Sequence, residues 1–388
     1  MISQFTIRLV NDTIDSSDVL RLTEWLRGDP RLTKSDQTVL FEQQWSAWQG
    51  RKYSVFVNSG SSANLAMLYA LMLSGRMQNK KVVVPAISWV TTVSPVIQLG
   101  LEPIMCDSDR DTLGIDIDQL RGIFENERPS ALIIVHVLGF PNKMEQVIDL
   151  CLEYGVILLE DSCESVGSTY EGIKTGSFGL MSSFSTYYGH HFSTIEGGIV
   201  NTDDEELYHI LLSIRSHGWD RDLPNSKKEE LRKSEGVSDF RALYTFYYPG
   251  FNLRSTDLQA FIGIGQLQKL DGFVKKRNEN FLMYQSLVNN DYWKIKVDDK
   301  CFVSNFAYPI ILPEDKFAKA VNELQGNGVE IRPLVCGSIS QQPFWKKLAR
   351  PSYTPFADIV HNHGMYLPNN PQMTRENIEF VCSIINSL

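Results

Sequence analysis

The chain has 388 residues, of which 43% are hydrophobic and 21% are charged, and its formal net charge is −9. This length accommodates two or three domains, and the composition excludes a largely disordered protein. The acidic balance argues against nucleic acid as the main partner, because phosphate binding needs a concentrated basic surface. No run approaches the roughly 18 apolar residues of a membrane span, and the first residues lack a signal-peptide pattern. We therefore expect a cytoplasmic protein with no membrane partner.

Cysteine usage bears on metals and redox compartment. The six cysteines are scattered, at Cys106, Cys151, Cys163, Cys301, Cys336 and Cys382. None belongs to a Cys-x-x-Cys or Cys-x-Cys pair, the spacing that is typical of zinc sites and iron–sulfur clusters. We therefore expect no metal, no iron–sulfur cluster and no disulfide framework, in a reducing compartment.

Short apolar runs alternate with helical patterns from about residue 50 to 200. The expected strands are 53–57, 82–85, 103–107, 131–139 and 156–161, and the expected helices are 61–73, 91–100, 116–124 and 143–155. Runs this rich in branched apolar residues suit strands that are buried on both faces. Their alternation with helices predicts an α/β fold with a mostly parallel sheet sandwiched by helices. In such sheets, ligands bind at the carboxyl ends of the strands.

The pattern changes after about residue 250. A long helical stretch, continuous or broken, is expected at 255–288, with further helices at 317–328 and 374–388 and strands at 302–312 and 330–335. This predicts a smaller α+β domain over 255–388, a large cofactor-binding α/β domain over 21–254, and an N-terminal segment, 1–20, that packs with either part. The polar stretch 221–239 is expected to be a surface excursion or a mobile loop.

Two polar segments follow predicted strands. Gly60, Ser61 and Ser62 open the helix after the first strand, where small residues and free N–H groups bind phosphate; the alternative is an ordinary serine N-cap. Asp161 ends a predicted central strand, where it would face a ligand crevice and hold a proton on a heterocyclic nitrogen. The alternative for Asp161 is a helix N-cap, and Glu164 is either part of the same site or a solvated first-turn acid.

Two further segments are ambiguous on their own. His190 and His191 precede a Gly-Gly turn, and adjacent residues point in different directions on a strand or a helix. We therefore do not expect them to share a metal or a task, and the alternative to a functional role is one buried structural histidine. The segment 249–254, Pro-Gly-Phe-Asn-Leu-Arg, reads as a turn before a long helix.

Taken together, these segments resemble the DegT/StrS family of sugar-nucleotide aminotransferases, which are pyridoxal-phosphate enzymes of fold type I. The resemblance runs from about residue 20 to the C-terminus, and it is carried by SGSSAN, VPAISWVTT, LLEDSCESVGS, SSFSTYYGHHFSTIEGG, RSHGWDRDL and PGFNLRSTDLQAFIGIGQL. Family members carry a lysine six residues before the acid of an Asp/Glu-Gly-Gly turn and link it covalently to the cofactor. Here that acid is Glu196, and the residue six positions before it is His190, which cannot form this link.

The histidine resembles that of two dehydratase groups within the family. One acts on a CDP-linked 4-keto-6-deoxyglucose with an iron–sulfur cluster, and the other acts on GDP-4-keto-6-deoxymannose without one. The scattered cysteines favour the second group. The resemblance then implies removal of the C3 hydroxyl in deoxysugar (colitose, O-antigen lipopolysaccharide) biosynthesis, with pyridoxal or pyridoxamine phosphate as cofactor and L-glutamate as amino donor. A 4-aminotransferase without its lysine, a CDP-sugar dehydratase and an inactive regulatory protein are the alternatives.

The resemblance also implies roles for individual residues. His190 would be the catalytic acid–base, with Glu164 as a second catalytic group. The cofactor would be bound by a set that supplies phosphate donors, a stacking ring and a partner for the pyridine nitrogen: Gly60, Ser61, Ser62, Trp89, Asp161, Ser185 and Asn252. Asn252 would reach the phosphate from the neighbouring subunit of a homodimer. His217 and Arg221 would lie near the sugar of the GDP-linked 4-keto-6-deoxyhexose.

Overall fold

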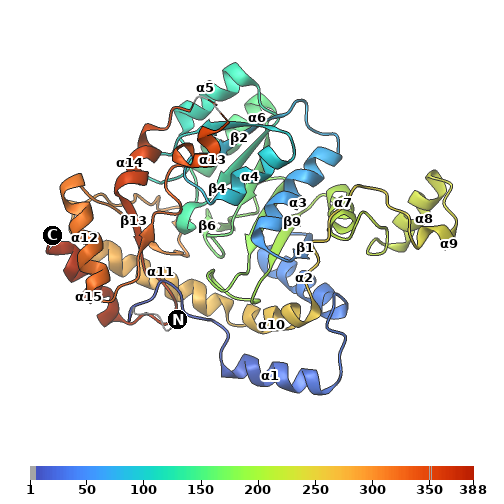
Figure 1. Cartoon of the computed structure of the whole chain (residues 1–388), viewed down its shortest axis with the longest axis horizontal. Helices are drawn as coiled ribbons and strands as arrows, with labels where there is room; N and C mark the ends of the chain where they lie inside the picture. The colour runs from blue at the N-terminus through green and yellow to red at the C-terminus, as the bar shows by residue number, and fades with distance from the viewer. Residues whose placement is uncertain (1–5, 349, 351) are drawn as a thin grey trace.

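A seven-stranded sheet forms the centre of the computed structural model, which describes residues 6–348, 350 and 352–388 (Figure 1). The strand order is β1-β9-β8-β5-β4-β2-β3. The strands are β1 (Tyr53–Val57), β2 (Lys81–Pro85), β3 (Glu102–Cys106), β4 (Ala131–Val135), β5 (Ile157–Asp161), β8 (Met181–Ser185) and β9 (Gly198–Thr202). β9 is antiparallel to both of its neighbours, and the other pairings are parallel, so the predicted mostly parallel sheet is confirmed.

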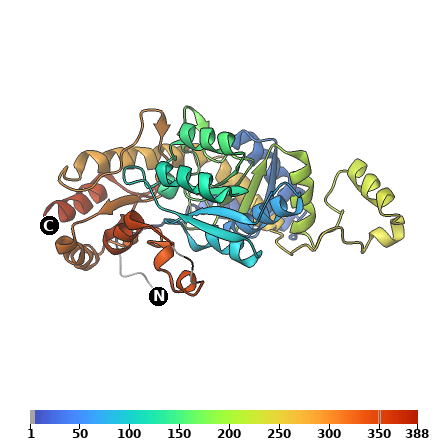
Figure 2. The ribbon, with the colours of Figure 1, turned by 90° about the horizontal axis from the view of Figure 1, so that it is seen from above.

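Both faces of the sheet are covered by helices, which explains the continuous apolar strands. Successive residues of β2 point to opposite faces: Val82 and Val84 pack in the core on one side, and Val83 packs in the core on the other. The first core includes α3 (Gly60–Leu73), α4 (Val90–Gln98) and α7 (Glu205–Arg215), and the second includes α5 (Ile117–Glu127) and α6 (Met144–Tyr154). Figure 2 shows these layers edge-on.

The C-terminal part contains a second, antiparallel sheet of order β11-β13-β12. Its elements are β11 (Tyr308–Ile311), α12 (Glu314–Gly326), β12 (Arg332–Pro333), α14 (Pro355–His363), β13 (Gly364–Leu367) and α15 (Arg375–Asn386). The strands predicted at 302–312 and 330–335 are therefore shorter than expected. The helix expected over 255–288 is broken into α10 (Asp257–Leu267) and α11 (Leu270–Leu287).

The N-terminal region packs on elements that follow residue 255. Ile7 forms a parallel bridge with Val329, beside the C-terminal sheet. Trp25 of α1 (Ser16–Arg27) stacks on Phe261 of α10 at 4.6 Å between ring centroids. Helix α2 (Asp36–Gln49) also packs on α10, with Phe41 and Ala260 in one core.

The polar stretch 221–239 contains a helix that the sequence did not predict. Helix α8 (Asn225–Ser234) has no buried residue, and together with α9 (Asp239–Ala242) it projects from the body of the molecule, as both ribbon views show (Figures 1 and 2). The prediction of a surface excursion is confirmed. Lysine and glutamate are good helix formers, and an exposed ion pair joins Lys227 to Glu230 at 2.7 Å, so the segment is helical without a core.

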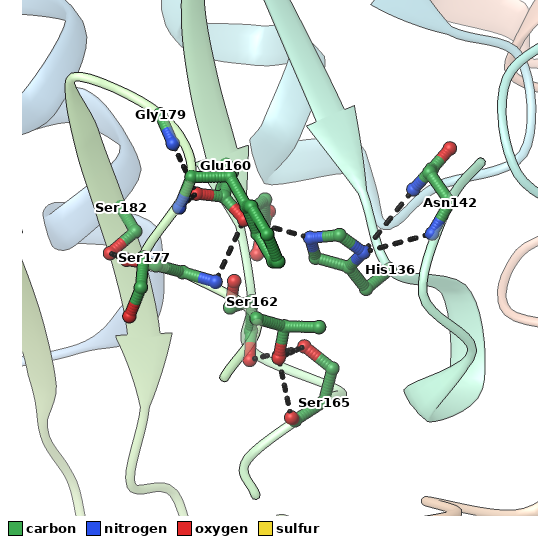
Figure 3. Close-up of polar contacts among 12 residues, drawn as sticks. His136, Asn142, Glu160, Ser162, Ser165, Ser177, Gly179 and Ser182 are labelled. Carbon is green, nitrogen blue, oxygen red and sulfur yellow. Dashed lines mark hydrogen bonds and ion pairs between the residues drawn. The ribbon is translucent and has the colours of Figure 1, made fainter. Parts of the chain in front are cut away.

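A buried network fixes the carboxyl end of β5. Glu160 Oε2 lies 3.0 Å from His136 Nε2, and its carboxylate accepts hydrogen bonds from the backbone N–H groups of Gly176, Phe178 and Gly179 (Figure 3). Burial alone would raise the pKa of Glu160, but His136 and the backbone donors outweigh it and lower the pKa. Because successive strand residues face opposite ways, this network turns the next residue of β5 to the other side of the sheet.

We expect Glu160→Ala to lower the free energy of unfolding by about 3–5 kcal/mol, because it leaves a buried histidine and three N–H groups without their acceptor. Urea denaturation measures this loss. The pKa of Glu160 is lower in the folded than in the unfolded protein. The stability difference between wild type and the variant is therefore complete above pH 4.5 and becomes smaller as the pH falls through the folded-state pKa of Glu160. Ser182→Ala is the control, because it removes a single hydrogen bond to the same loop and should cost about 1 kcal/mol. Equal losses of unfolding free energy in Glu160→Ala and Ser182→Ala would contradict the role of Glu160 as the centre of this network.

Candidate active site

A cavity of about 340 Å³ lies at the carboxyl edge of the parallel strands. Gly60 follows β1, Trp89 follows β2, Asp161 ends β5 and Ser185 ends β8, and all four line the cavity. Parallel strands end at the same edge of a sheet, so the fold brings together residues that are far apart in the sequence. The cavity wall is completed by Ser61, Glu164, Tyr187, His190, Glu196, Phe306 and Tyr366, among others.

The start of α3 forms an anion cradle. A Cβ atom built on Gly60 would lie 2.6 Å from the Cβ of Ser185, so only glycine allows this close approach of the helix to β8. The first N–H groups of a helix have no partner within the helix and favour a negative charge. Ser61 lines the cavity, whereas Ser62 does not: its N–H donates to Ser59 Oγ at 3.1 Å. The alternative reading, an ordinary serine N-cap, therefore holds for Ser59, which caps α3 by accepting the hydrogen bond of the Ser62 N–H.

Asp161 is buried at the base of the cavity and held in one orientation. Its Oδ2 accepts from Asn64 Nδ2 at 2.7 Å and from the Thr92 hydroxyl at 2.8 Å, and its Oδ1 accepts from the Cys163 N–H at 3.2 Å. A carboxylate offers about four acceptor positions. One position therefore remains for a donor inside the cavity, such as a protonated ring nitrogen.

His190 and His191 point to different environments. His190 lines the cavity, its ring centroid lies 5.3 Å from that of Phe306, and its Nδ1 is shielded from solvent with no hydrogen-bond partner among the described residues. Burial lowers the pKa of His190 to about 4, although Asp161 and a backbone hydrogen bond to Cys163 oppose this shift. His191 is fully buried, and its Nε2 lies 3.0 Å from the Ser304 carbonyl oxygen. The cavity therefore contains one neutral imidazole, which can accept a proton.

Glu164 lies in the same cavity and titrates near neutral pH. Burial raises the pKa of Glu164 to about 7, the Leu138 N–H opposes the shift, and the charge of Asp161 adds to it. The Leu138 N–H donates to Glu164 Oε2 at 2.7 Å from a backbone with φ of 52°. Leu138 belongs to a short 3-10 helix, Val137–Gly139, that follows β4, so the strand predicted over 131–139 is wrong in length and stops at Val135. Strained backbone of this kind is frequent at functional sites.

We expect Glu164→Gln to stabilise the cofactor-free protein at high pH. The pKa of Glu164 in the folded protein, about 7, lies above its usual value of 4.5. The protonated Glu164 carboxyl therefore contributes fully to the stability of the folded protein below pH 4.5, and this contribution is lost as the pH rises through about 7. The neutral amide avoids this loss, and the variant should be more stable than wild type by about 1–3 kcal/mol at pH 8. Urea unfolding at pH 4.5, 7 and 8 measures the difference. Glu196→Gln is the control, because it makes the same substitution at an exposed position in the cavity wall.

Trp89 presents a large exposed ring to the cavity. Its exposed fraction is 55%, although it is an apolar residue at the start of α4. An aromatic face left in solvent beside an anion cradle is suited to stacking on a planar ligand ring. Gly60, Ser61, Trp89, Asp161, Glu164, Ser185 and His190 of the predicted site residues therefore meet in one cavity.

Three predicted residues lie away from the cavity of their own chain. Asn252 is exposed and forms a backbone bridge with Ser216. His217 has a left-handed backbone with φ of 61°, and Arg221 stacks over the Trp219 ring at 3.6 Å. All of them belong to the base of the α8–α9 excursion, and none lines the cavity.

Several residues of the cavity wall had no sequence signal. Val10, Phe306 and Tyr366 come from the N-terminal segment and the C-terminal part, and single apolar or aromatic residues there form no motif. Asn64 was recognisable in principle, because it follows Gly60 by one helical turn and therefore lies on the same face of α3. Among the described residues, no helix has the length and apolar character to cross a membrane, and no group of three or more His, Cys, Asp or Glu side chains is placed to hold a metal ion.

This sheet, with its cavity at the strand ends, is the architecture of pyridoxal-phosphate enzymes of fold type I. The chain belongs to the DegT/DnrJ/EryC1/StrS aminotransferase family, whose sequence profile matches residues 12–386. It is 35% identical over 364 residues to the GDP-4-keto-6-deoxy-D-mannose 3-dehydratase of Yersinia pseudotuberculosis, an alignment that covers 91% of each chain. The family expected from the sequence motifs is therefore confirmed.

Two solved structures are similar over nearly the whole chain. The Escherichia coli GDP-4-keto-6-deoxy-D-mannose-3-dehydratase with bound hydrated PLP has a TM-score of 0.91 and 32% identity, and the match covers 98% of this chain and 99% of that one. A GDP-4-keto-6-deoxymannose-3-dehydratase with a trapped PLP-glutamate geminal diamine has a TM-score of 0.89 and 32% identity, covering 98% and 100%. The expected fold class is confirmed by both.

Proposed function

We propose that this protein is a sugar-nucleotide 3-dehydratase that removes the C3 hydroxyl of GDP-4-keto-6-deoxymannose. The observation that carries this proposal is His190, which lines the cavity. It stands six residues before Glu196, where the aminotransferases that the motifs resemble carry lysine. A histidine can move a proton but cannot link covalently to the cofactor. The similarity to enzymes named for this reaction supports the choice of substrate, and the PLP-glutamate adduct in one of them supports glutamate as the amino donor.

The cavity fits pyridoxamine phosphate, which supplies an electron sink next to the C4 carbonyl of the sugar. The cradle at Gly60, with the hydroxyls of Ser61 and Ser185, would bind the phosphate group. Asp161 would accept the hydrogen bond of the protonated ring nitrogen at its free acceptor position. Trp89 would cover one face of the ring and exclude water.

His190 and Glu164 would move the protons. The neutral imidazole of His190 accepts a proton from a carbon acid, and the imidazolium returns a proton to the C3 hydroxyl as it departs. The Glu164 carboxyl is half protonated near pH 7, so it can donate or accept close to the same place. Both groups lie inside one partly enclosed cavity, where electrostatic interactions are stronger than in water.

Product analysis tests the proposal. The protein is incubated with GDP-4-keto-6-deoxymannose, pyridoxal phosphate and glutamate, and the products are identified by mass spectrometry. We expect a sugar nucleotide that is lighter by one oxygen atom, with one ammonia and one 2-oxoglutarate formed for each sugar. An amino sugar without released ammonia would instead identify an aminotransferase. If the protein converts the CDP-linked sugar and not the GDP-linked sugar, the proposed substrate is wrong.

We also propose that the active unit is a homodimer in which Asn252 completes the site of the neighbouring subunit. Asn252 is exposed and lies outside the cavity of its own chain. The excursion beside it exposes large aromatic side chains, with exposed fractions of 79% for Phe240 and 75% for Tyr244. Exposed apolar groups of this kind mark contact surfaces, and symmetric dimers are the commonest oligomers.

We expect Asn252→Ala to weaken cofactor binding by about 10-fold or more, which corresponds to one lost hydrogen bond to a charged group, without unfolding the chain. Absorbance titration measures the affinity, and circular dichroism checks the fold. Asn126→Ala, at an exposed asparagine of α5, is the matched control and should bind the cofactor like wild type. A fully active monomer in sedimentation would contradict the dimer proposal.

A further inference from the structure

Arg277 of α11 is a buried cation without a counter-ion. Its exposed fraction is 3%, and no carboxylate of the described residues pairs with it. The contrast is Arg215, which is equally buried but pairs with Glu42 and Asp222. Burial lowers the pKa of Arg277 to about 9. A buried charge is costly unless it is paired, so the reason for this arginine lies in what its guanidinium binds.

The Arg277 guanidinium donates only to backbone carbonyl groups, and these come from three segments. Nη2 donates to the carbonyl oxygen of His190 at 3.3 Å, and Nη1 donates to that of Phe306 at 2.9 Å. Nη1 also donates to the carbonyl groups of Asn305 and Asn369. The planar fork of arginine suits several acceptors at once, which the ammonium group of lysine does not match.

The segments that Arg277 joins form the wall of the cavity. His190 and Phe306 both line it, and their ring centroids are 5.3 Å apart. The side chain of Asn305 donates to the Leu138 carbonyl oxygen at 2.8 Å, and the N–H of Leu138 holds Glu164. One guanidinium therefore supports the main chain behind both proton-moving groups.

The charge of Arg277 acts on the imidazole as well. The charged and titratable groups that act on His190 are Asp161 on β5, His191 beside it and Arg277 on α11. The other titratable residues of the cavity wall are Cys163, Glu164, Tyr187, Glu196 and Tyr366. Burial lowers the pKa of His190 most, Arg277 lowers it further, and Asp161 raises it. Without Arg277, only burial would oppose the attraction of Asp161 for a proton on His190.

We propose that Arg277 is a positioning residue, whose guanidinium fixes the main chain at His190 and Phe306 and whose unpaired charge acts on the His190 imidazole. This inference rests on the proposed role of His190. It concerns the placement and protonation of that side chain, however, and both can be measured in the cofactor-free protein.

Nuclear magnetic resonance of histidine-labelled, cofactor-free protein tests the electrostatic part. The His190 signal is identified by its absence in His190→Asn, and in wild type it should titrate near pH 4. In Arg277→Met, the titration should move upward by about one pH unit, because the opposing charge is gone. In Arg277→Lys, the titration should stay close to that of wild type, since the positive charge remains.

Steady-state kinetics test the positional part. Arg277→Lys should lower kcat by about 10- to 100-fold with little change in KM, because small displacements of a catalytic group are costly. The matched control is Asn280→Ala, which removes hydrogen bonds from α11 to Asn369 and Asn370 but none to His190. This control should lose stability while keeping both its kcat and the His190 titration.

Two results would overturn the inference. A His190 titration in Arg277→Met that matches wild type would remove the electrostatic part, and equal losses of kcat in Arg277→Lys and Asn280→Ala would leave only a structural role. If Arg277→Met does not fold, the kinetic comparison of Arg277→Lys with Asn280→Ala decides whether Arg277 positions His190 or has only a structural role. A protein that shows the shifted titration but no dehydration would overturn the proposed function and not this inference.

Discussion

Replacing His190 with asparagine should reduce deoxygenation by about 10²- to 10⁴-fold, the usual loss when a positioned acid–base group is removed. Cofactor binding should stay nearly intact, because the cradle at Gly60 and the carboxylate of Asp161 are unchanged. His190 is the neutral imidazole of the cavity, with a pKa lowered to about 4 by burial, so wild type keeps its base form through the neutral range. The rate of 3-deoxy product formation per folded protein measures the effect.

His190→Lys is the sharper variant. A lysine at this position could restore the covalent link that aminotransferases of the family make to the cofactor, and the protein should then be yellow and trapped by borohydride. Lysine would still move a proton, but we expect it to favour amino transfer over elimination.

The neighbouring histidine provides the control. His191→Asn removes the hydrogen bond to the Ser304 carbonyl group, which should cost about 1–3 kcal/mol of stability while the folded fraction retains more activity than His190→Asn. If His191→Asn is inactive and His190→Asn is active, the catalytic assignment passes to His191 and the reaction class stays the same.

Asp161→Asn should lower turnover by roughly 10²-fold or more, because it removes the negative charge that holds a protonated ring nitrogen. The amide keeps the shape of the side chain but brings an NH₂ group to a place where Asn64, Thr92 and the Cys163 N–H already donate. Cofactor affinity should fall as well, by about 10- to 100-fold for one charge-assisted hydrogen bond. Absorbance titration and product analysis measure the two losses separately.

Glu160→Gln is the matched control for Asp161→Asn, because the two acids are adjacent on β5 and face opposite sides of the sheet. Glu160 contacts His136 and the 176–179 loop and does not line the cavity. We expect Glu160→Gln to lower the free energy of unfolding but to retain the activity of each folded molecule. Wild-type turnover in Asp161→Asn would show that the cavity does not use this carboxylate.

The sequence by itself determined most of the parallel strands of the central sheet and one side of the cavity. The strands expected at 53–57, 82–85, 103–107 and 156–161 lie within one residue of those observed, because continuous β-branched runs form strands only where both faces are buried. The residues predicted at their carboxyl ends, such as Gly60 and Asp161, meet because parallel strands end at one edge. Both inferences need only local pattern and one topological rule.

The tertiary structure decided the ends of several elements and the environment of the site. Apolar composition continues through 131–139, but the strand stops at Val135 and a 3-10 helix with a left-handed residue, Leu138, follows it; no periodicity in the sequence encodes that change. Phe306, Tyr366 and Arg277 approach His190 from distant parts of the chain, since packing of the C-terminal part, and not any motif, brings them there. Burial and neighbouring charges then move the pKa of His190 to about 4 and that of Glu164 to about 7, because both shifts depend on desolvation and distances that only the folded chain defines.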